Sequence, residues 1–229
     1  MDLNQKLIDF EKSLSPGELA NFKLLLGISA GGLSPNIYDK ETTPEFDFVA
    51  KYISETQPYS YKKDKTGIAW VGRPEFMTDE LLKSLTDESK VKRTTAIDYT
   101  DHYLGCGGVI ADKLSISNEL VDFIKIHVGD IKPTGIASYI YYDKEGQGIS
   151  PHIDTDVFSL NVLIMLEHIV VNDTPSNLVM FPYEAEPIKV KLTPGDMIIM
   201  FSGSTAHGRE LLANGEKVSI LTLGFHPLG

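Results

Sequence analysis

The sequence predicts a mainly β protein in which antiparallel strands build a sandwich or barrel and helices flank it. From residue 135 onward, short β-branched and aromatic runs alternate with turn residues, for example GIASYIYY, VFSLNVLIML, DMIIMF and KVSILTLGF. No helix-length amphipathic segment interrupts these runs, which favours antiparallel strands over strand–helix–strand units. Before residue 135 the pattern is helical and irregular, so we expect this part to buttress the sheet.

Helix signals are concentrated in the first half of the chain. Ser15 and Glu18 form a capping box with a proline at the first helical position between them. The segments 44–55, 78–88 and 117–128 have the spacing of apolar residues that is typical of helices. We expect one domain over residues 1–229, with 1–134 as a helical and irregular buttress and substrate lid, and 135–229 as the β-rich core.

Composition and charge narrow the possible partners. The chain has 229 residues, 42% of them hydrophobic and 23% charged, as in ordinary globular proteins. Its formal net charge of −11 repels phosphate backbones and anionic membranes, so we expect a small-molecule substrate, no nucleic acid and no membrane. The single cysteine, Cys106, cannot form an intramolecular disulfide, and the N-terminus lacks a signal-peptide pattern, which predicts a cytoplasmic protein.

Three potential metal ligands lie in the β-rich part. GISPHIDTD places His152 and Asp154 two residues apart at the mouth of a strand, where side-chain alternation directs both to one side of the sheet. LTPGDMIIMFSGSTAHG leads from a Pro-Gly-Asp turn through a buried strand to His207. Several strands of about five or six residues fit between Asp154 and His207, so the two sites can meet across a rolled sheet.

Two imidazoles and one carboxylate on one face leave further coordination positions open. This facial triad suits non-haem iron(II) oxygenases, in which the open positions accept a co-substrate and oxygen. A structural zinc site with four protein ligands would have no such position. Zinc-dependent hydrolysis also fits this ligand set, so the triad by itself leaves the reaction open.

Two cationic residues are candidates for binding a carboxylate beside the metal. Lys217 and Ser219 follow an Asn-Gly turn, and we expect them on the face of His207, positioned to bind the far carboxylate of a metal-bound dicarboxylate. Arg209, two residues beyond His207, is the alternative anchor and should share the face of His207. We favour Lys217, because an arginine so near the metal would more naturally contact the prime substrate.

These motifs resemble the 2-oxoglutarate/iron(II)-dependent oxygenase superfamily, in its prolyl-hydroxylase-like or small-molecule-oxidising branch. The resemblance rests on HxD at 152–154, the Gly-Asp strand before His207 and Lys-x-Ser at 217–219, and it covers roughly residues 135–229. Most members have arginine where Lys217 stands, although some use lysine. The resemblance implies that residues 135–229 form a double-stranded β-helix, a jelly roll of the cupin-like type.

The resemblance also implies roles for individual residues. His152, Asp154 and His207 would bind Fe(II), while Lys217 and Ser219 would bind the distal carboxylate of the co-substrate 2-oxoglutarate, with O2 as the second co-substrate.

A tyrosine near Tyr142 would line the 2-oxoglutarate pocket. Tyr139 and Tyr141 should share one face of their strand and Tyr142 the other. We assign Arg209 and Arg73 as candidate contacts of the prime substrate.

The implied reaction is oxidation of an unactivated C–H bond of a small molecule, such as an amino acid or specialised metabolite, with succinate and carbon dioxide as co-products. Asp154 favours hydroxylation over halogenation, since halogenating members usually have a small residue there. The alternatives are a metal-dependent hydrolase, a cupin-type dioxygenase without 2-oxoglutarate, and a non-catalytic β-barrel that binds a small ligand. The sequence leaves the oligomeric state open.

Overall fold

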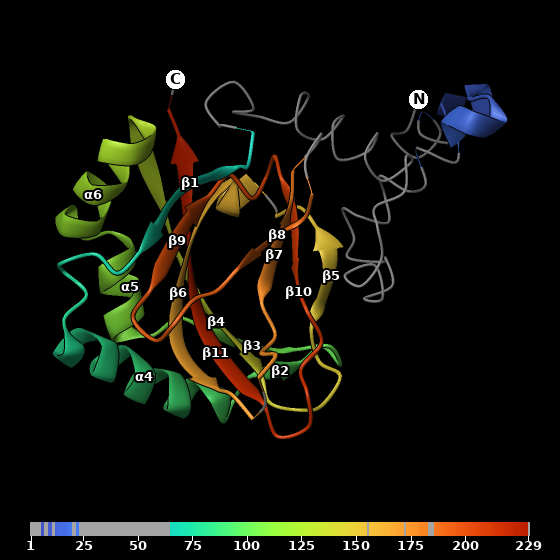
Figure 1. Ribbon diagram of the computed structural model, residues 1–229. Coiled ribbons are helices and arrows are strands. Elements are labelled where there is room, and N and C mark those ends of the chain that lie inside the picture. Colours follow the sequence, from blue (N-terminus) through green and yellow to red (C-terminus); the bar gives the residue numbers. More distant parts are fainter. Residues whose placement is uncertain are drawn as a thin grey trace.

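The computed structural model describes residues 65–154, 156–171, 173–182 and 186–228, and near the N-terminus residues 6, 9–10, 12–19 and 22. The predicted helix over 44–55 lies outside the described residues. Figure 1 shows the elements, which in chain order are β1 (Ile68–Gly72), α4 (Asp79–Arg93), β2 (Ile97–Asp98), β3 (Tyr103–Cys106), α5 (Val109–Ser115), α6 (Asn118–Val128), β4 (Ile131–Tyr142), β5 (Ile149–His152), η3 (Asp156–Phe158), β6 (Leu160–Ile169), β7 (Leu178–Phe181), β8 (Ile188–Val190), β9 (Met197–Met200), β10 (Ala206–Arg209) and β11 (Lys217–Pro227).

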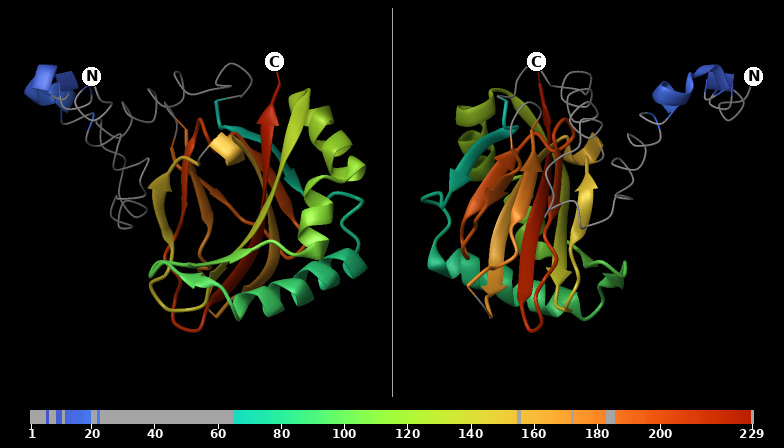
Figure 2. Two further views of the ribbon diagram at one scale, coloured as in Figure 1. Left: turned by 180° about the vertical axis from the view of Figure 1, so that it is seen from behind. Right: turned by 45° about the vertical axis from the view of Figure 1, so that its right-hand side comes forward.

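The strands of this part of the chain form two sheets that face each other, as Figure 2 shows. The major sheet has the order β1-β9-β6-β11-β4-β3-β2, and the minor sheet has the order β5-β10-β7-β8. The neighbouring strands pair antiparallel in both sheets. The predicted mainly β fold with a jelly-roll core is therefore confirmed.

Side-chain alternation along β11 separates two hydrophobic cores. Val218 and Ile220 face the minor sheet and pack with Leu178 and Met180 of β7. Leu221 and its alternate neighbours face the opposite side, where the helices lie. The strand is therefore buried on both faces, which explains why its sequence is an almost continuous apolar run.

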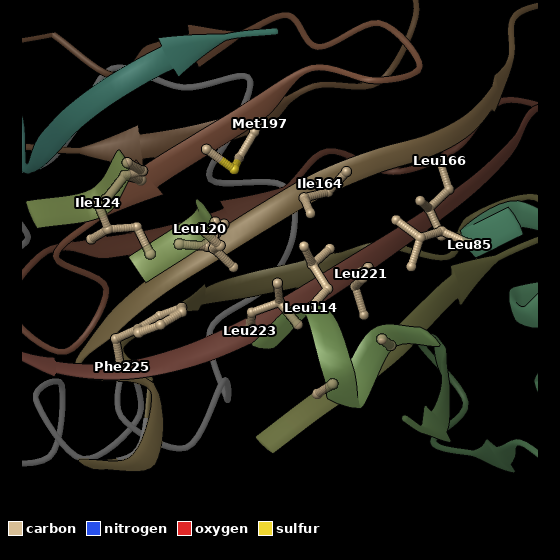
Figure 3. Packing of buried hydrophobic residues seen from close by; sticks show 14 of the residues in the cluster. Leu85, Leu114, Leu120, Ile124, Ile164, Leu166, Met197, Leu221, Leu223 and Phe225 are labelled. Atoms are coloured by element: carbon tan, nitrogen blue, oxygen red, sulfur yellow. The ribbon is translucent and has the colours of Figure 1, made fainter. Parts of the chain in front are cut away.

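Helices α4, α5 and α6 cover the outer face of the major sheet (Figure 1). The three helices and the sheet share one buried hydrophobic cluster, and Figure 3 shows its packing. Fully or almost fully buried members of this cluster are Leu85, Leu114, Leu120, Ile124, Ile164, Met197, Leu221, Leu223 and Phe225. The predicted helical buttress is present on this face.

The predicted helix starts agree with the capping contacts. The Ser15 hydroxyl accepts a hydrogen bond from the Glu18 amide at 3.4 Å, and the Glu18 carboxylate accepts one from the Ser15 amide at 2.8 Å, as a capping box requires. The predicted helices over 78–88 and 117–128 are α4 and α6. Thr78 and Ser117 cap them, each accepting a hydrogen bond from an amide of the first turn.

The segment before residue 135 contains more strand than the sequence predicted. β1 lies at one edge of the major sheet, β3 and β2 extend the other edge, and β4 begins at Ile131. Helix α5 was also not predicted. These elements are too short to show a period, and their strand conformation depends on partners that are distant in the sequence. A substrate lid within residues 1–134 stays a prediction, because residues 23–64 lie outside the described residues.

In the described part of the chain, no helix has the length and apolar character needed to cross a membrane.

Replacing a buried leucine of α6 tests how far the helical layer stabilises the sheet. Leu120 is 0% exposed, and we expect Leu120→Ala to lower the free energy of unfolding by about 2–5 kcal/mol, because it leaves a cavity against the major sheet. Ile126, on the same helix, is 78% exposed, and Ile126→Ala should change the free energy of unfolding by no more than about 0.5 kcal/mol. Urea unfolding of both variants is the measurement, and equal losses would contradict this packing.

Candidate metal centre

Two strands of the minor sheet bring the predicted histidines together. His152 ends β5, His207 lies in β10, and the two residues are register partners in the antiparallel β5–β10 pair. Asp154 follows β5, and its amide donates a hydrogen bond to the carbonyl of Ser202 at 3.0 Å. This bond joins the segment after β5 to the loop before β10, so that all three candidate ligands converge at one point.

The donor atoms of the three side chains have the spacing of a metal site. Asp154 Oδ1 lies 3.5 Å from His152 Nε2 and 3.6 Å from His207 Nε2. The potential ligand atoms all lie within 4.8 Å of one another. An ion with bonds of about 2.1 Å can therefore contact both members of each Asp–His pair, because twice that bond length exceeds the separations.

Backbone carbonyls orient both imidazole rings. Nδ1 of His152 lies 2.8 Å from the carbonyl oxygen of Ser150, and Nδ1 of His207 lies 3.2 Å from that of Thr205. A carbonyl only accepts hydrogen bonds, so each Nδ1 donates its hydrogen, and in the neutral imidazole each Nε2 then keeps its lone pair. This tautomer presents both Nε2 atoms to a shared ion.

Burial and charge favour the protonation states that a metal requires at Asp154 and His207, whereas at His152 the effect of burial is outweighed by the Asp154 carboxylate, which raises the pKa of that imidazole. Burial lowers the pKa of His207 to about 4, so this imidazole is neutral at pH 7. Burial acts to raise the pKa of Asp154, but the two imidazoles and a hydrogen bond from Asn161 hold it well below its usual range. At neutral pH the site therefore offers a carboxylate and a neutral imidazole, the forms in which these groups bind metals.

Asn161 of β6 is a functional candidate that the sequence analysis missed. Its Nδ2 donates a hydrogen bond to Asp154 Oδ2 at 2.8 Å, which leaves Oδ1 directed at the two histidines. The side chain is 5% exposed. An asparagine within the apolar run LNVLIML was the signal that could have revealed it, since buried polar side chains need partners.

The triad lines a cavity of about 50 Å³ between the two sheets. Apolar side chains from both sheets form much of its wall, namely Ile140, Ile149, Leu163, Leu178, Met200 and Ile220. Such a lining restricts water at the metal and strengthens electrostatic interactions inside the cavity.

Arg209 and Tyr142 lie in the same cavity as the triad. Arg209 is 4% exposed and follows His207 on β10 by two residues, so it shares the face of His207 as predicted. Its guanidinium carbon lies 5.4 Å from the centroid of the Tyr142 ring. Burial raises the pKa of Tyr142, and the nearby Arg209 charge acts in the opposite direction.

The predicted division of the β4 tyrosines between two faces is confirmed. The hydroxyl of Tyr139 donates to the Glu88 carboxylate and that of Tyr141 to the Ser89 carbonyl, both at 2.7 Å and both on α4. Tyr142 points to the other face, into the cavity.

The prediction that Lys217 and Ser219 lie beside the metal is wrong. Both residues face the helices, because their neighbours Val218 and Ile220 face the cavity side. Ser219 Oγ lies 2.9 Å from Ser89 Oγ of α4, and Lys217 is exposed. The two residues share a face as expected, but it is the face of the sheet opposite to the cavity, because alternate residues of a strand point to opposite sides.

Arg73 is also placed away from the triad. Its Nη2 lies 2.5 Å from Asp79 Oδ1, and its Nε donates to the carbonyl of Met77 at 3.0 Å. These contacts hold the connection between β1 and α4. The prediction that Arg73 contacts the prime substrate has no support in this geometry.

Comparisons with known proteins identify the fold. No family model and no curated protein matches the chain. A prolyl-4-hydroxylase of Pseudomonas putida is 16% identical, with a TM-score of 0.53 over 69% of this chain and 93% of that chain. The non-haem, α-ketoglutarate-dependent epimerase SnoN of nogalamycin biosynthesis is 10% identical, with a TM-score of 0.61 over 78% and 83% of the two chains.

A third similar structure is HygX of Streptomyces hygroscopicus with nickel, 2-oxoglutarate and hygromycin B bound. It is 12% identical, with a TM-score of 0.56 over 76% of this chain and 87% of that chain. Identities this low show the fold alone, and the predicted double-stranded β-helix is confirmed. What the site does must be argued from its own residues.

The hydrogen bond from Asn161 to Asp154 should contribute to metal affinity. We expect Asn161→Ala to weaken metal binding by about 10–100-fold, because Asp154 loses the hydrogen bond that orients it. His207→Ala should weaken binding further, since it removes a ligand. Asn177→Ala is the matched control, because the Asn177 amide also donates to a carboxylate, that of Glu210, at 2.8 Å but outside the triad. Calorimetric titration with nickel(II) is the measurement; equal affinities of the Asn161 and Asn177 variants would contradict the role of Asn161.

Proposed function

We propose that the protein is a non-haem iron(II), 2-oxoglutarate-dependent oxygenase that oxidises a C–H bond of a small molecule. One observation carries this proposal: two imidazoles and one carboxylate converge on a cavity that also contains the buried cation Arg209. The first three groups suit iron(II) with open coordination positions. The fourth suits a carboxylate at the far end of a co-substrate.

The donor set fits iron(II). His152 and His207 would bind through Nε2 and Asp154 through Oδ1, while Asn161 keeps Oδ2 occupied. When bound, the iron would supply the redox chemistry that couples 2-oxoglutarate and oxygen to oxidation of the substrate, with succinate and carbon dioxide as co-products. The protein contributes the three ligands, their orientation and an apolar wall that limits water.

Arg209 replaces Lys217 as our candidate anchor for 2-oxoglutarate. Among the described residues that line the cavity, Arg209 is the side chain with a permanent positive charge. Arg209 follows His207 by two residues, so the Cα atoms of these two residues lie about 6.7 Å apart along the strand. A five-carbon dicarboxylate bound to the metal can span this separation, because the arginine side chain also extends toward it. The planar guanidinium can bind a carboxylate through two hydrogen bonds. Tyr142 stands beside it and completes this end of the site.

A small molecule is the proposed prime substrate. The net charge of −11 disfavours nucleic acid, and two of the similar structures concern small molecules, nogalamycin biosynthesis for SnoN and bound hygromycin B for HygX. Hydroxylation is the proposed outcome, because the carboxylate of Asp154 occupies a coordination position that a halide would otherwise need.

Succinate release tests the proposed chemistry directly. With iron(II), 2-oxoglutarate and oxygen, we expect succinate formation, slow and uncoupled when the prime substrate is absent. His152→Ala, Asp154→Ala and His207→Ala should each abolish it, because each removes one ligand. Folded, metal-loaded wild-type protein that releases no succinate would contradict the proposal and favour a hydrolase or a non-catalytic binding protein.

Substitution of the two candidate anchors should have different effects on 2-oxoglutarate binding. Arg209→Ala should cost about 2–5 kcal/mol of 2-oxoglutarate binding, because the buried carboxylate loses its cation, and this corresponds to a Kd higher by about thirtyfold or more. Lys217→Ala should bind 2-oxoglutarate as the wild type does, since Lys217 is exposed on the other face. Titration of 2-oxoglutarate into the nickel(II)-loaded proteins decides between them, and the reverse pattern would restore Lys217 as the anchor.

A further inference from the structure

A buried polar network continues from Arg209 away from the triad. Arg209 lines the metal cavity and also a neighbouring cavity of about 90 Å³, which Ser176 and His168 line as well. Nη2 of Arg209 donates to the carbonyl oxygen of Ser176 at 3.1 Å and lies 3.2 Å from its hydroxyl oxygen. Ser176 is 5% exposed, so these contacts are formed away from bulk water.

Glu216 in turn holds Ser176. Its carboxylate accepts hydrogen bonds from the amide and from the hydroxyl of Ser176, both at 2.8 Å. It also accepts one from the amide of Ala213 at 3.0 Å, and Nε2 of His168 lies 2.7 Å from it. Glu216 is 1% exposed, and its pKa is lowered because these hydrogen bonds outweigh the effect of burial. It is therefore an ionised, acceptor-only group at neutral pH.

The chemistry of a hydroxyl makes this arrangement directional. Ser176 has one hydroxyl hydrogen, and an ionised Glu216 can only accept it. The oxygen lone pairs of Ser176 are then turned toward Arg209, whose guanidinium can only donate. Glu216 thus sets the polarity of a hydroxyl that contacts the Arg209 side chain.

We propose that Glu216, acting through Ser176, is a positioning residue that holds the guanidinium of Arg209 in place for the distal carboxylate of 2-oxoglutarate. This inference rests on the proposed function. An arginine side chain loses about 2 kcal/mol of rotamer entropy when it is ordered, so a guanidinium ordered before binding gives tighter binding. Glu216 thus positions the proposed anchor, whereas its exposed neighbour Lys217 faces away from the cavity.

The experiment compares 2-oxoglutarate binding by nickel(II)-loaded variants. Ser176→Ala removes the hydroxyl but keeps the hydrogen bond from Arg209 to the Ser176 carbonyl. Glu216→Gln keeps one oxygen acceptor but replaces the other with an NH2 group, which would then face a donor of either Ala213 or Ser176. We expect each variant to raise the Kd for 2-oxoglutarate on the order of tenfold, the usual effect of losing a hydrogen bond to a charged group. The Kd for nickel(II) should stay at the wild-type value.

Glu210→Gln is the matched control. Glu210 also holds the turn before β7, because its carboxylate accepts hydrogen bonds from the amide and the side chain of Asn177 at 2.9 and 2.8 Å. Two carboxylates therefore hold the same turn. Glu210 binds Asn177, whereas Glu216 binds Ser176, the residue that contacts Arg209. We expect Glu210→Gln to lower the melting temperature without changing the Kd for 2-oxoglutarate.

A second comparison separates positioning from general stability. In an Arg209→Lys background, the added Glu216→Gln change should raise the Kd for 2-oxoglutarate much less than tenfold, because the guanidinium that Ser176 holds is absent. A full tenfold effect in that background would overturn the inference.

The outcomes also distinguish this inference from the proposed function. If wild-type protein with bound nickel(II) failed to bind 2-oxoglutarate, the proposed function would fall, and the inference with it. If wild type bound 2-oxoglutarate and the Ser176 and Glu216 variants bound it equally well, the inference alone would be wrong. Equal weakening by Glu210→Gln would likewise overturn it, since the effect would then come from a loosened turn.

Discussion

The antiparallel pairing of β10 with β5 is the interaction on which the candidate site depends. It makes His207 the register partner of His152, and the bond between the Asp154 amide and the Ser202 carbonyl brings the carboxylate to the same point. A slip of one residue between these short strands would turn one histidine out of the cavity. The major sheet supplies the opposite wall of the cavity, and the helices pack against the other face of that sheet.

Hydrogen bonds orient the triad and Arg209 within the cavity. Asn161 holds Asp154, Thr205 and Ser150 orient the histidines, and Ser176 contacts Arg209. Each of these bonds offsets the cost of removing a polar group from water and also selects one geometry for the functional atom. The same hydrogen bonds therefore stabilise the fold and position the functional side chains. For this reason a variant at this site requires separate measurements of folding stability, metal affinity and co-substrate affinity.

The similar structures share the fold at low sequence identity, and their names cover hydroxylation and epimerisation. A double-stranded β-helix by itself thus specifies no single reaction. The set of two imidazoles and one carboxylate favours the proposed oxygenase, and the buried arginine in the same cavity favours 2-oxoglutarate as the proposed co-substrate. The two proposals can be tested independently, because the metal and the co-substrate would contact different residues.

Strand alternation, capping residues and ligand spacing are local patterns, so the β-rich core, the helices α4 and α6, and the three residues of the triad could be predicted from the sequence alone. The sequence could not decide which face of β11 meets the cavity. Lys217 and Glu216 are neighbours, and the turn before β11 directs Glu216 inward and Lys217 outward, a choice that no local pattern records. Arg209 and Ser176 likewise acquired their partners only through contacts between segments that are distant in the sequence. Tertiary structure decided these roles because a strand presents alternate residues to opposite faces, and only the packing of the two sheets selects the face that becomes the site.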